Sequence, residues 1–268
     1  MRSGPRWDKR IASDWEWVGP PSRPSLSELL IYERHLMKLP RASKIMILGS
    51  TAELRDMCFL HHFKTVVVDY DADAFNVLGG HLRHPDLAEF VNCDWRDVEF
   101  VDEFDAVIGD LALNMMPLSD QEKVLSKVAA SLVAGGLFVH RSWVQLPRER
   151  SKRGTLEQIL HRQSQAESCS NHFYSLAMPL IAYYRSADAS IDFQDVLAGL
   201  RRSFEQDLVH ADILDEFERS WNNYHLLNWV PSARKHDACM KKYLEHVETG
   251  YGNDPYRESC PIYAMRKH

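Results

Sequence analysis

Short apolar runs alternate with amphipathic segments over the first half of the chain. The apolar runs have the length and composition of buried strands, and they cover residues 44–48, 65–69, 90–94, 105–110 and 136–140. Between them lie segments with apolar residues at helical spacing, near 52–62, 72–83 and 118–133. Strands that alternate with helices predict βαβ units, and therefore a doubly wound, parallel sheet.

The alternation stops near residue 144. From there to about residue 245 the chain has no convincing strand pattern but several helical ones, around 154–168, 172–186, 191–206 and 208–226. Residues 245–252 and 260–267 again have the pattern of two strands, joined by a turn-rich linker. We therefore expect an α/β fold. A doubly wound, mostly parallel seven-stranded sheet carries a large helical insertion and ends with an antiparallel C-terminal strand.

Composition and charge limit the kinds of binding partner and the cellular compartment that we expect for the protein. The 268 residues are 45% apolar and 26% charged, and the formal net charge of −6 gives no electrostatic basis for binding nucleic acid or an anionic membrane. Five scattered cysteines without CxxC spacing argue for a reducing compartment and against a disulfide framework or zinc site. Cys58 lies near His61 and His62, but no second ligand cluster follows, so we expect no metal. With no apolar N-terminal core and no long apolar run, a cytoplasmic location is expected.

The stretch KIMILGSTAELRDM, residues 44–57, is a strand that runs through Gly49 directly into a helix. A dinucleotide-binding turn needs the pattern GxGxxG and a P-loop needs GxxxxGK[ST], and neither is present. Ser50 and Thr51 can offer hydroxyl and backbone N–H groups, whereas Glu53 in the first helical turn would repel a phosphate. The turn therefore favours a nucleoside ligand without a phosphate.

Asp69 ends the second strand, twenty residues after Gly49. In sheets of this kind a carboxylate at that position accepts hydrogen bonds from a ribose diol. The alternative is that Asp69 caps the next helix, for which Asp71 is the better candidate. Arg55 is expected to form a structural ion pair with Asp56, with contact to a ligand carboxylate as the alternative.

Five segments in this order and spacing resemble the motifs of the class I S-adenosylmethionine-dependent methyltransferases, over residues 40–143 and the terminal strand pair. They are MILGSTAEL, VVVDYD, NCDW, FDAVIGDLALNMM and SLVAGGLFVHR. The resemblance implies that Asp69 binds the ribose, that Asp94 reaches the adenine amino group, and that Cys93 or Trp95 flanks the ring. The first motif departs from the family pattern, because one glycine replaces the usual three. The implied cofactor is S-adenosyl-L-methionine, and the candidate cofactor-binding residues are Gly49, Ser50, Thr51, Asp69, Tyr70, Cys93, Asp94, Trp95, Asp110 and Leu111.

The ends of the fourth and fifth strands carry the candidate chemistry. Asn114 and Asp110 could hold the methionine ammonium or orient an acceptor nitrogen; the alternative is a helix cap, a role that suits Ser119 and Asp120 better. A general base is needed only when the attacked atom is protonated, and His140 is the candidate. The candidate catalytic residues are Asn114, His140 and Tyr183. The candidate substrate-binding residues are Arg23, Tyr32, Arg141, Trp143 and Tyr184.

The pattern of strands and helices along the chain predicts four segments. Residues 1–39 form an N-terminal arm and helix that cover the site, 40–146 the cofactor-binding core, 147–244 the helical insertion or lid, and 245–268 the terminal strand pair. Aromatic residues of the insertion suggest a small, enclosed acceptor.

The expected function is methyl transfer to the N or O atom of a small molecule, by direct in-line displacement, in small-molecule metabolism or biosynthesis. One alternative is attack on the aminobutyrate arm of the cofactor, with ring closure and release of methylthioadenosine. The others are a non-catalytic nucleoside-binding scaffold and, least favoured, an NAD-dependent dehydrogenase. We expect a small-molecule partner, no nucleic acid and no membrane, and the chain could form a homodimer.

Overall fold

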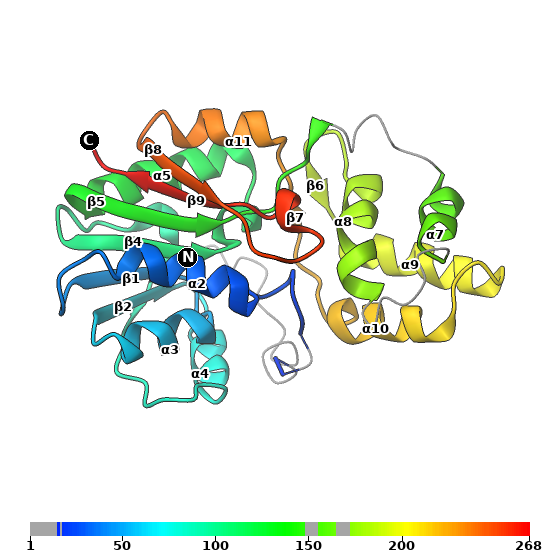
Figure 1. Cartoon of the computed structure of the whole chain (residues 1–268), viewed down its shortest axis with the longest axis horizontal. Helices are drawn as coiled ribbons and strands as arrows, with labels where there is room; N and C mark the ends of the chain where they lie inside the picture. Colours follow the sequence, from blue (N-terminus) through cyan, green and yellow to red (C-terminus); the bar gives the residue numbers. More distant parts are fainter. Residues whose placement is uncertain (1–14, 17, 148–154, 165–171) are drawn as a thin grey trace.

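The computed structural model describes residues 15–16, 18–147, 155–164 and 172–268. Its centre is a seven-stranded sheet with the strand order β3-β2-β1-β4-β5-β9-β8 (Figure 1). The first five strands run parallel, whereas β9 is antiparallel to both β5 and β8. The strands are β1 (Lys44–Leu48), β2 (Lys64–Asp69), β3 (Glu89–Asn92), β4 (Phe104–Asp110), β5 (Leu132–Arg141), β8 (Glu245–Gly250) and β9 (Ile262–Arg266). The predicted fold class is confirmed.

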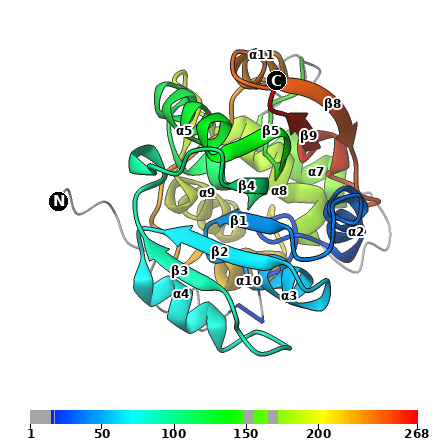
Figure 2. The ribbon, with the colours of Figure 1, turned by 90° about the vertical axis from the view of Figure 1, so that its left-hand side faces the viewer.

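Helices cover both faces of the sheet, which is why its central strands are apolar at consecutive positions. Successive side chains point to opposite faces, so Ile45 and Ile47 pack on one side and Met46 and Leu48 on the other. The first side is covered by α2 (Leu26–Leu36) and α3 (Ala52–Leu60). The second side is covered by α5 (Leu118–Ser131) and α11 (Ala233–Met240). Figure 2 shows these two layers on either side of the twisted sheet.

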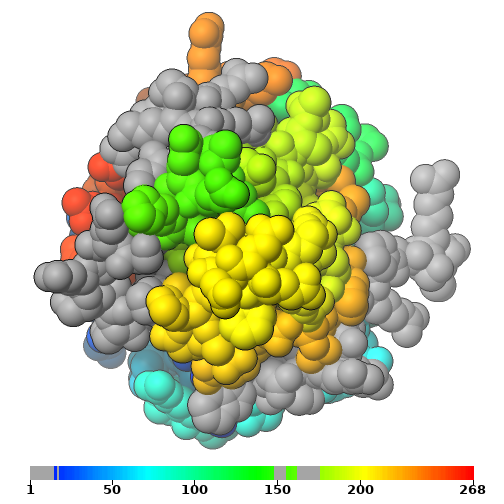
Figure 3. Space-filling view, turned by 90° about the vertical axis from the view of Figure 1, so that its right-hand side faces the viewer, coloured from blue at the N-terminus to red at the C-terminus, as the bar shows by residue number. Residues whose placement is uncertain are grey.

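The helical insertion has a hydrophobic core of its own. Figure 1 places it beyond the carboxyl ends of the parallel strands, and Figure 3 shows its outer face, with α9 and α10 in the middle. Its helices are α7 (Leu156–Ser164), α8 (His172–Tyr184), α9 (Phe193–Glu205) and α10 (Ala211–Trp221). It also contains a short antiparallel ribbon, β6 (Ser190–Ile191) with β7 (Asn228–Trp229). The sequence did not predict this ribbon, because two residues per strand are too few to show a period.

The N-terminal segment begins α2 with a capping box. The Ser25 side chain accepts a hydrogen bond from the Glu28 backbone, and the Glu28 side chain accepts one from the Ser25 backbone. Before the helix, Trp15 and Val18 pack on Leu78 of α4 (Ala72–Gly79). The segment before α2 therefore lies beside the carboxyl ends of β1 and β2. Residues 1–14 and 17 of the predicted N-terminal arm lie outside the described residues.

Candidate functional site

A cavity of 1360 Å³ lies at the carboxyl ends of β1, β2 and β4, between the sheet and the insertion. One side, the strand-end wall, contains all ten residues predicted to bind a cofactor, from Gly49–Thr51 through Leu111. The opposite side, the insertion wall, is formed by Phe193, Ser220, Trp221, Tyr224, His225, Leu226, Leu227, Asn228 and Trp229. The cavity therefore has the position and size for a nucleoside cofactor together with a second small molecule.

Gly49 stands where the backbone turns from β1 toward α3. Its φ of +89° lies in the left-handed region, which a residue with a side chain adopts only with strain. Its N–H donates to the Val68 carbonyl, and the Trp95 ring lies 3.5 Å from the place a Cβ would take. The first motif therefore has its single glycine at the position of this turn where the backbone needs a positive φ.

Asp69 is held at the end of β2 by two hydrogen bonds. Its Oδ2 accepts from the Ser50 hydroxyl at 2.7 Å, and its Oδ1 accepts from the Asp71 N–H at 3.0 Å. Burial raises the pKa of this carboxyl to about 6, against the two bonds, which lower it. The helix α4 is capped by Asp71, whose carboxylate accepts from the backbone N–H groups of Asp73 and Ala74. Asp69 is therefore not the cap, and its carboxylate faces the cavity largely ionised at neutral pH.

Trp95, Cys93 and Asp94 follow β3 and form the next part of the strand-end wall. The Trp95 indole donates to the Val68 carbonyl at 2.6 Å, which fixes the ring against Gly49. Asp94 is paired with Arg96, and this hydrogen bond lowers the pKa of Asp94. The Asp94 side chain lies on the strand-end wall, and both of its carboxylate oxygens accept hydrogen bonds from Arg96.

Asp110 and Arg141 are register partners on β4 and β5, and they form a buried ion pair. Arg141 donates from Nε to Asp110 Oδ1 at 2.6 Å and from Nη1 to Glu28 Oε2 at 2.8 Å. Its Nη2 donates to Asp110 Oδ2 and to the Pro21 carbonyl, both at 3.0 Å. The guanidinium is fully buried and its donors point at protein groups. The predicted contact between Arg141 and an acceptor carboxylate is therefore wrong, whereas Asp110 keeps its place on the cavity wall.

Tyr32 and Asn114 are also engaged inside the protein. The Tyr32 hydroxyl donates to the Gly109 carbonyl at 2.7 Å and accepts from the Arg141 N–H at 2.8 Å. Asn114 donates to the carbonyls of Trp143 and Trp229, and its Oδ1 accepts from the Ser142 hydroxyl and the Trp143 N–H. Both side chains are fully buried, and neither residue lines the cavity. Asn114 fastens the insertion to the end of β5 instead of contacting an acceptor.

His140 is buried between the sheet and α11. Its ring stacks on Phe138, and its Nε2 lies 3.3 Å from the Nε2 of His236, so one imidazole donates to the other. It does not line the cavity. The hypothesis that His140 is the general base is wrong for a physical reason: its side chain packs against His236 of α11 and does not line the cavity.

The histidine pair predicts acid sensitivity. Burial lowers the pKa of His236 to about 4, partly offset by Asp237, and lowers that of His140 well below 6.5. Because the unfolded chain binds protons near pH 6.5 and the folded pair does not, stability is lost as the pH falls below 6.5. We expect wild type to lose about 2 kcal/mol more than His236→Gln between pH 7 and pH 5, measured by urea unfolding. Parallel stability curves for the two proteins would contradict this assignment.

The remaining predicted residues divide between the cavity and its surroundings. Trp143 lines the cavity. Tyr183 and Tyr184 pack against the core of the insertion, with ring centroids 5.0 Å apart, and neither is a cavity residue. Arg23 donates to the Trp15 carbonyl at 3.0 Å and pairs with Glu53 at 3.5 Å. These two tyrosines and Arg23 therefore support the walls and are not placed to touch an acceptor.

Several cavity residues were not among the predicted site residues. The most prominent are Phe193, Trp221, Tyr224, His225 and Trp229, all from the insertion. Aromatic content was the only sequence signal for them, and it does not distinguish a core position from a cavity position. His225 lies in the loop after α10, and among the described residues it is the histidine that lines the cavity.

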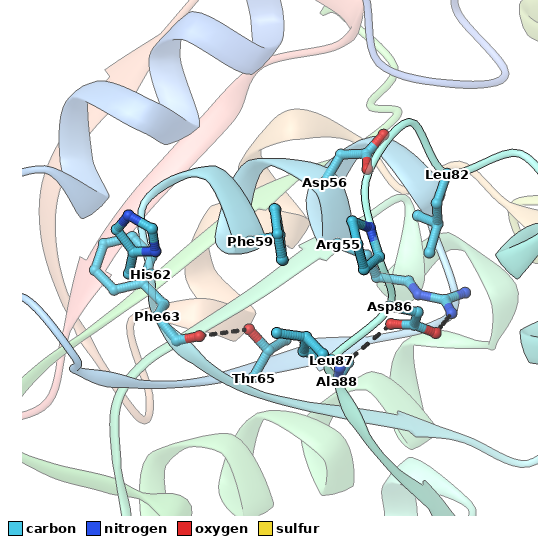
Figure 4. A pocket seen from close by; sticks show the side chains of 11 residues that line it. Arg55, Asp56, Phe59, His62, Phe63, Thr65, Leu82, Asp86, Leu87 and Ala88 are labelled. Atoms are coloured by element: carbon cyan, nitrogen blue, oxygen red, sulfur yellow. Dashed lines mark hydrogen bonds and ion pairs between the residues drawn. The ribbon is translucent and has the colours of Figure 1, made fainter.

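A second, smaller hollow of 230 Å³ lies away from the strand ends, between α3 and the segment before β3. Figure 4 shows Arg55 beside Asp86 there, with Phe59 and Leu87 around the opening. Arg55 forms its ion pair with Asp86, so the expected pair with Asp56 is wrong. Asp56 instead accepts hydrogen bonds from the backbone N–H groups of residues 83 and 84. This hollow is remote from the strand-end wall, and we take the large cavity as the candidate site.

Within the described part of the chain, no group of three or more His, Cys, Asp or Glu side chains is arranged to hold a metal ion. None of the helices described there is both long enough and apolar enough to cross a membrane.

No protein-family model matches the chain, and no curated protein sequence matches it. Solved structures do resemble it. A putative zinc-dependent alcohol dehydrogenase from Rhodobacter sphaeroides aligns over 96% of this chain and 98% of its own, with 14% identity and a TM-score of 0.57. A chain from the complex of the Haloferax volcanii Trm112 methyltransferase activator with a putative methyltransferase aligns over 97% and 95%, with 11% identity and a TM-score of 0.55.

The N-methyltransferase NodS from Bradyrhizobium japonicum, in complex with S-adenosylhomocysteine, also resembles the chain. It aligns over 97% of this chain and 98% of its own, with 12% identity and a TM-score of 0.50. At these identities the likeness concerns the fold. The chain has the class I methyltransferase fold, with the seven-stranded sheet and its antiparallel C-terminal strand.

Proposed function

We propose that the chain binds S-adenosyl-L-methionine in the large cavity and transfers its methyl group to a small molecule. One observation carries this proposal. The ten residues that the family resemblance assigned to the cofactor all line one wall of a single cavity, and the insertion supplies the opposite wall. The solved N-methyltransferase with bound S-adenosylhomocysteine, which has the same fold, supports it.

The residues present fit this cofactor better than a dinucleotide. The Asp69 carboxylate can accept from both ribose hydroxyls, and the fixed Trp95 ring offers a face for the adenine. Glu53 lies in the first turn of α3, where a pyrophosphate would otherwise bind. When bound, the cofactor would supply a methyl group activated by a sulfonium sulfur.

The protein's own part is to align the acceptor and to exclude water. In-line displacement gains most of its rate from holding the two reacting atoms in position. The insertion wall is rich in aromatic side chains, which exclude water and stabilise a nearby positive charge. His225 on that wall can accept a proton from an acceptor whose reactive atom is protonated at working pH.

Incubation with S-adenosyl-L-methionine and a panel of small molecules tests the reaction. Mass spectrometry should find S-adenosylhomocysteine and a product heavier by one methylene only when an acceptor is present. Formation of methylthioadenosine without an acceptor would instead assign the chemistry to the aminobutyrate arm. We place the reaction in the cytoplasm, because the five cysteines are scattered without CxxC spacing, which argues for a reducing compartment.

His225→Gln should lower turnover of an acceptor with a protonated reactive atom by about 100-fold, because the variant cannot accept the proton. Affinity for S-adenosylhomocysteine should not change. His210→Gln is the control, since His210 is an exposed residue of the same insertion outside the cavity. Equal turnover in the two variants would remove His225 from the mechanism.

A further inference from the structure

We propose that the segment before α2 is a lid, which opens to admit the cofactor and closes over the ribose and the aminobutyrate arm. The inference rests on the proposed binding of S-adenosyl-L-methionine and names the part of the chain that controls its exchange. The lid consists of the described residues 15, 16 and 18–24. It is supported by where this segment lies, by what it covers and by how it is fastened.

The lid reaches from α3 to α4. The Trp15 indole donates to Glu53 Oε1 in the first turn of α3 at 3.2 Å, and Trp15 and Val18 pack on Leu78 of α4. Trp15, Val18 and Ser22 line the large cavity, and Figure 1 shows this segment in dark blue on the side of the sheet that faces the insertion. Because α3 and α4 follow the loops at the ends of β1 and β2, a segment that joins the two helices passes over those loops.

Two groups that the cofactor must reach are almost covered. Ser50 and Asp69, at the ends of β1 and β2, are only 4% and 7% exposed although both line the cavity. Asp69 is the carboxylate that we assign to the ribose diol. A ribose needs both faces of its diol edge against that carboxylate, so an element that closes over these strand ends must move when the cofactor enters.

Of the two elements that close over the strand ends, the lid has the weaker apolar fastening. The insertion shares a hydrophobic core with residues of the sheet, among them Leu111 after β4 and Cys260 before β9. The lid contributes to a small cluster, in which Trp15 and Val18 pack on Leu78. A segment with few buried apolar contacts opens locally at a low cost in free energy, so the lid is the part that opens.

The end of the lid next to α2 is fixed, and Arg23 fastens the other end to it. The Pro21 carbonyl accepts from Arg141 Nη2 at 3.0 Å, and the capping box fixes the start of α2. From this fixed part, Arg23 Nη1 donates to the Trp15 carbonyl at 3.0 Å and lies 3.5 Å from Glu53 Oε1. The Arg23 guanidinium therefore joins the fixed end, the movable end and α3, and it is the latch of the closed lid.

Such a latch controls rates more than affinity. It stabilises the closed lid both before and after the cofactor binds, so its removal makes the lid open more often in both states. The association and dissociation rate constants then rise together, and the dissociation constant, which is their ratio, changes little. Removal of a residue that only contacts the bound cofactor has a different effect, because it raises the dissociation rate constant alone.

Stopped-flow fluorescence with S-adenosylhomocysteine measures both rate constants. Arg23→Met removes the latch at a residue that does not line the cavity. We expect both rate constants to rise about 10-fold and the dissociation constant to change less than about 3-fold. Arg34→Met is the control, because it removes the same charge from an ion pair with Glu248 outside the cavity, and its rate constants should equal those of wild type. An unchanged association rate constant in Arg23→Met overturns the inference.

Hydrogen exchange on the wild-type protein gives an independent result. Saturating S-adenosylhomocysteine should slow exchange of the lid amides at least about 5-fold, because a ligand in the cavity adds contacts to Trp15, Val18 and Ser22. Equal exchange with and without the ligand would contradict closure of the lid. If Arg23→Met fails to fold, this measurement decides alone. Failure of S-adenosylhomocysteine to bind wild type would instead reject the proposed function.

Discussion

Arg141→Met should lower the free energy of unfolding by about 3–5 kcal/mol, because it leaves Glu28 and Asp110 buried without their shared cation. For a chain of this size that loss corresponds to a fall in melting temperature of about 10 °C. Methionine fills a similar volume, so the effect measures the charge and its hydrogen bonds more than a cavity.

The destabilisation should depend on pH in a definite direction. Burial raises the pKa of Glu28 and of Asp110, and Arg141 opposes this in both. Without Arg141 both pKa values rise further. Since a raised carboxyl pKa costs stability only above the unfolded pKa, the defect should shrink as the pH falls toward 5. Urea unfolding at pH 5 and pH 8 measures this difference.

A matched variant separates the charge effect from packing. Adding Glu28→Gln and Asp110→Asn to Arg141→Met removes both uncompensated charges and should recover part of the lost stability. Two results would contradict this account of the buried cluster. One is an Arg141→Met variant whose free energy of unfolding lies within about 1 kcal/mol of wild type. The other is a triple variant that is less stable than Arg141→Met alone.

Asp69→Asn should weaken the binding of S-adenosylhomocysteine by about 10- to 100-fold. The amide keeps one acceptor oxygen but loses the charge and the second acceptor, and hydrogen bonds to a charged group contribute about 1.5–3 kcal/mol. Stability should not fall, because the raised pKa of Asp69 means that ionisation of this buried carboxyl is a cost at neutral pH. Calorimetry measures the affinity for S-adenosylhomocysteine, and thermal unfolding measures the stability.

The control for Asp69→Asn is Asp71→Ala, two residues away. Asp71 caps α4, so Asp71→Ala should lower the free energy of unfolding by about 1 kcal/mol and leave affinity nearly unchanged. If Asp69→Asn instead lowered the melting temperature and left affinity intact, Asp69 would have the structural role and the ribose assignment would be wrong.

The sequence predicted the strand-end wall well for a physical reason. Buried parallel strands appear as apolar runs with definite ends, and the carboxyl ends of parallel strands meet at one edge of the sheet. Residues directly at those ends, such as Ser50, Asp69 and Asp110, therefore lie together without any knowledge of the rest of the fold.

The residues that sequence reasoning misplaced are polar groups satisfied by partners far along the chain. Arg141 bonds to Glu28, 113 residues away, and His140 meets His236, 96 residues away. Asn114 likewise reaches the Trp229 carbonyl across 115 residues. Such pairings depend on how α2, α11 and the insertion dock, which no local pattern encodes.

The insertion wall could not be predicted for a related reason. Its aromatic residues follow helical spacing, and the same pattern serves a packed core and a cavity face. Tyr183 and Tyr224 look alike in the sequence, yet the structure packs the first into the insertion and places the second on the cavity. Only the docking of the insertion against the strand ends separates them.

The most direct measurement is a calorimetric titration of the wild-type protein with S-adenosylhomocysteine, and in parallel with NAD⁺. The account predicts one site per chain with a dissociation constant on the order of micromolar for S-adenosylhomocysteine, and no heat of binding for NAD⁺. Binding of NAD⁺ in preference to S-adenosylhomocysteine, or no binding of S-adenosylhomocysteine at all, would contradict the assignment of the cavity.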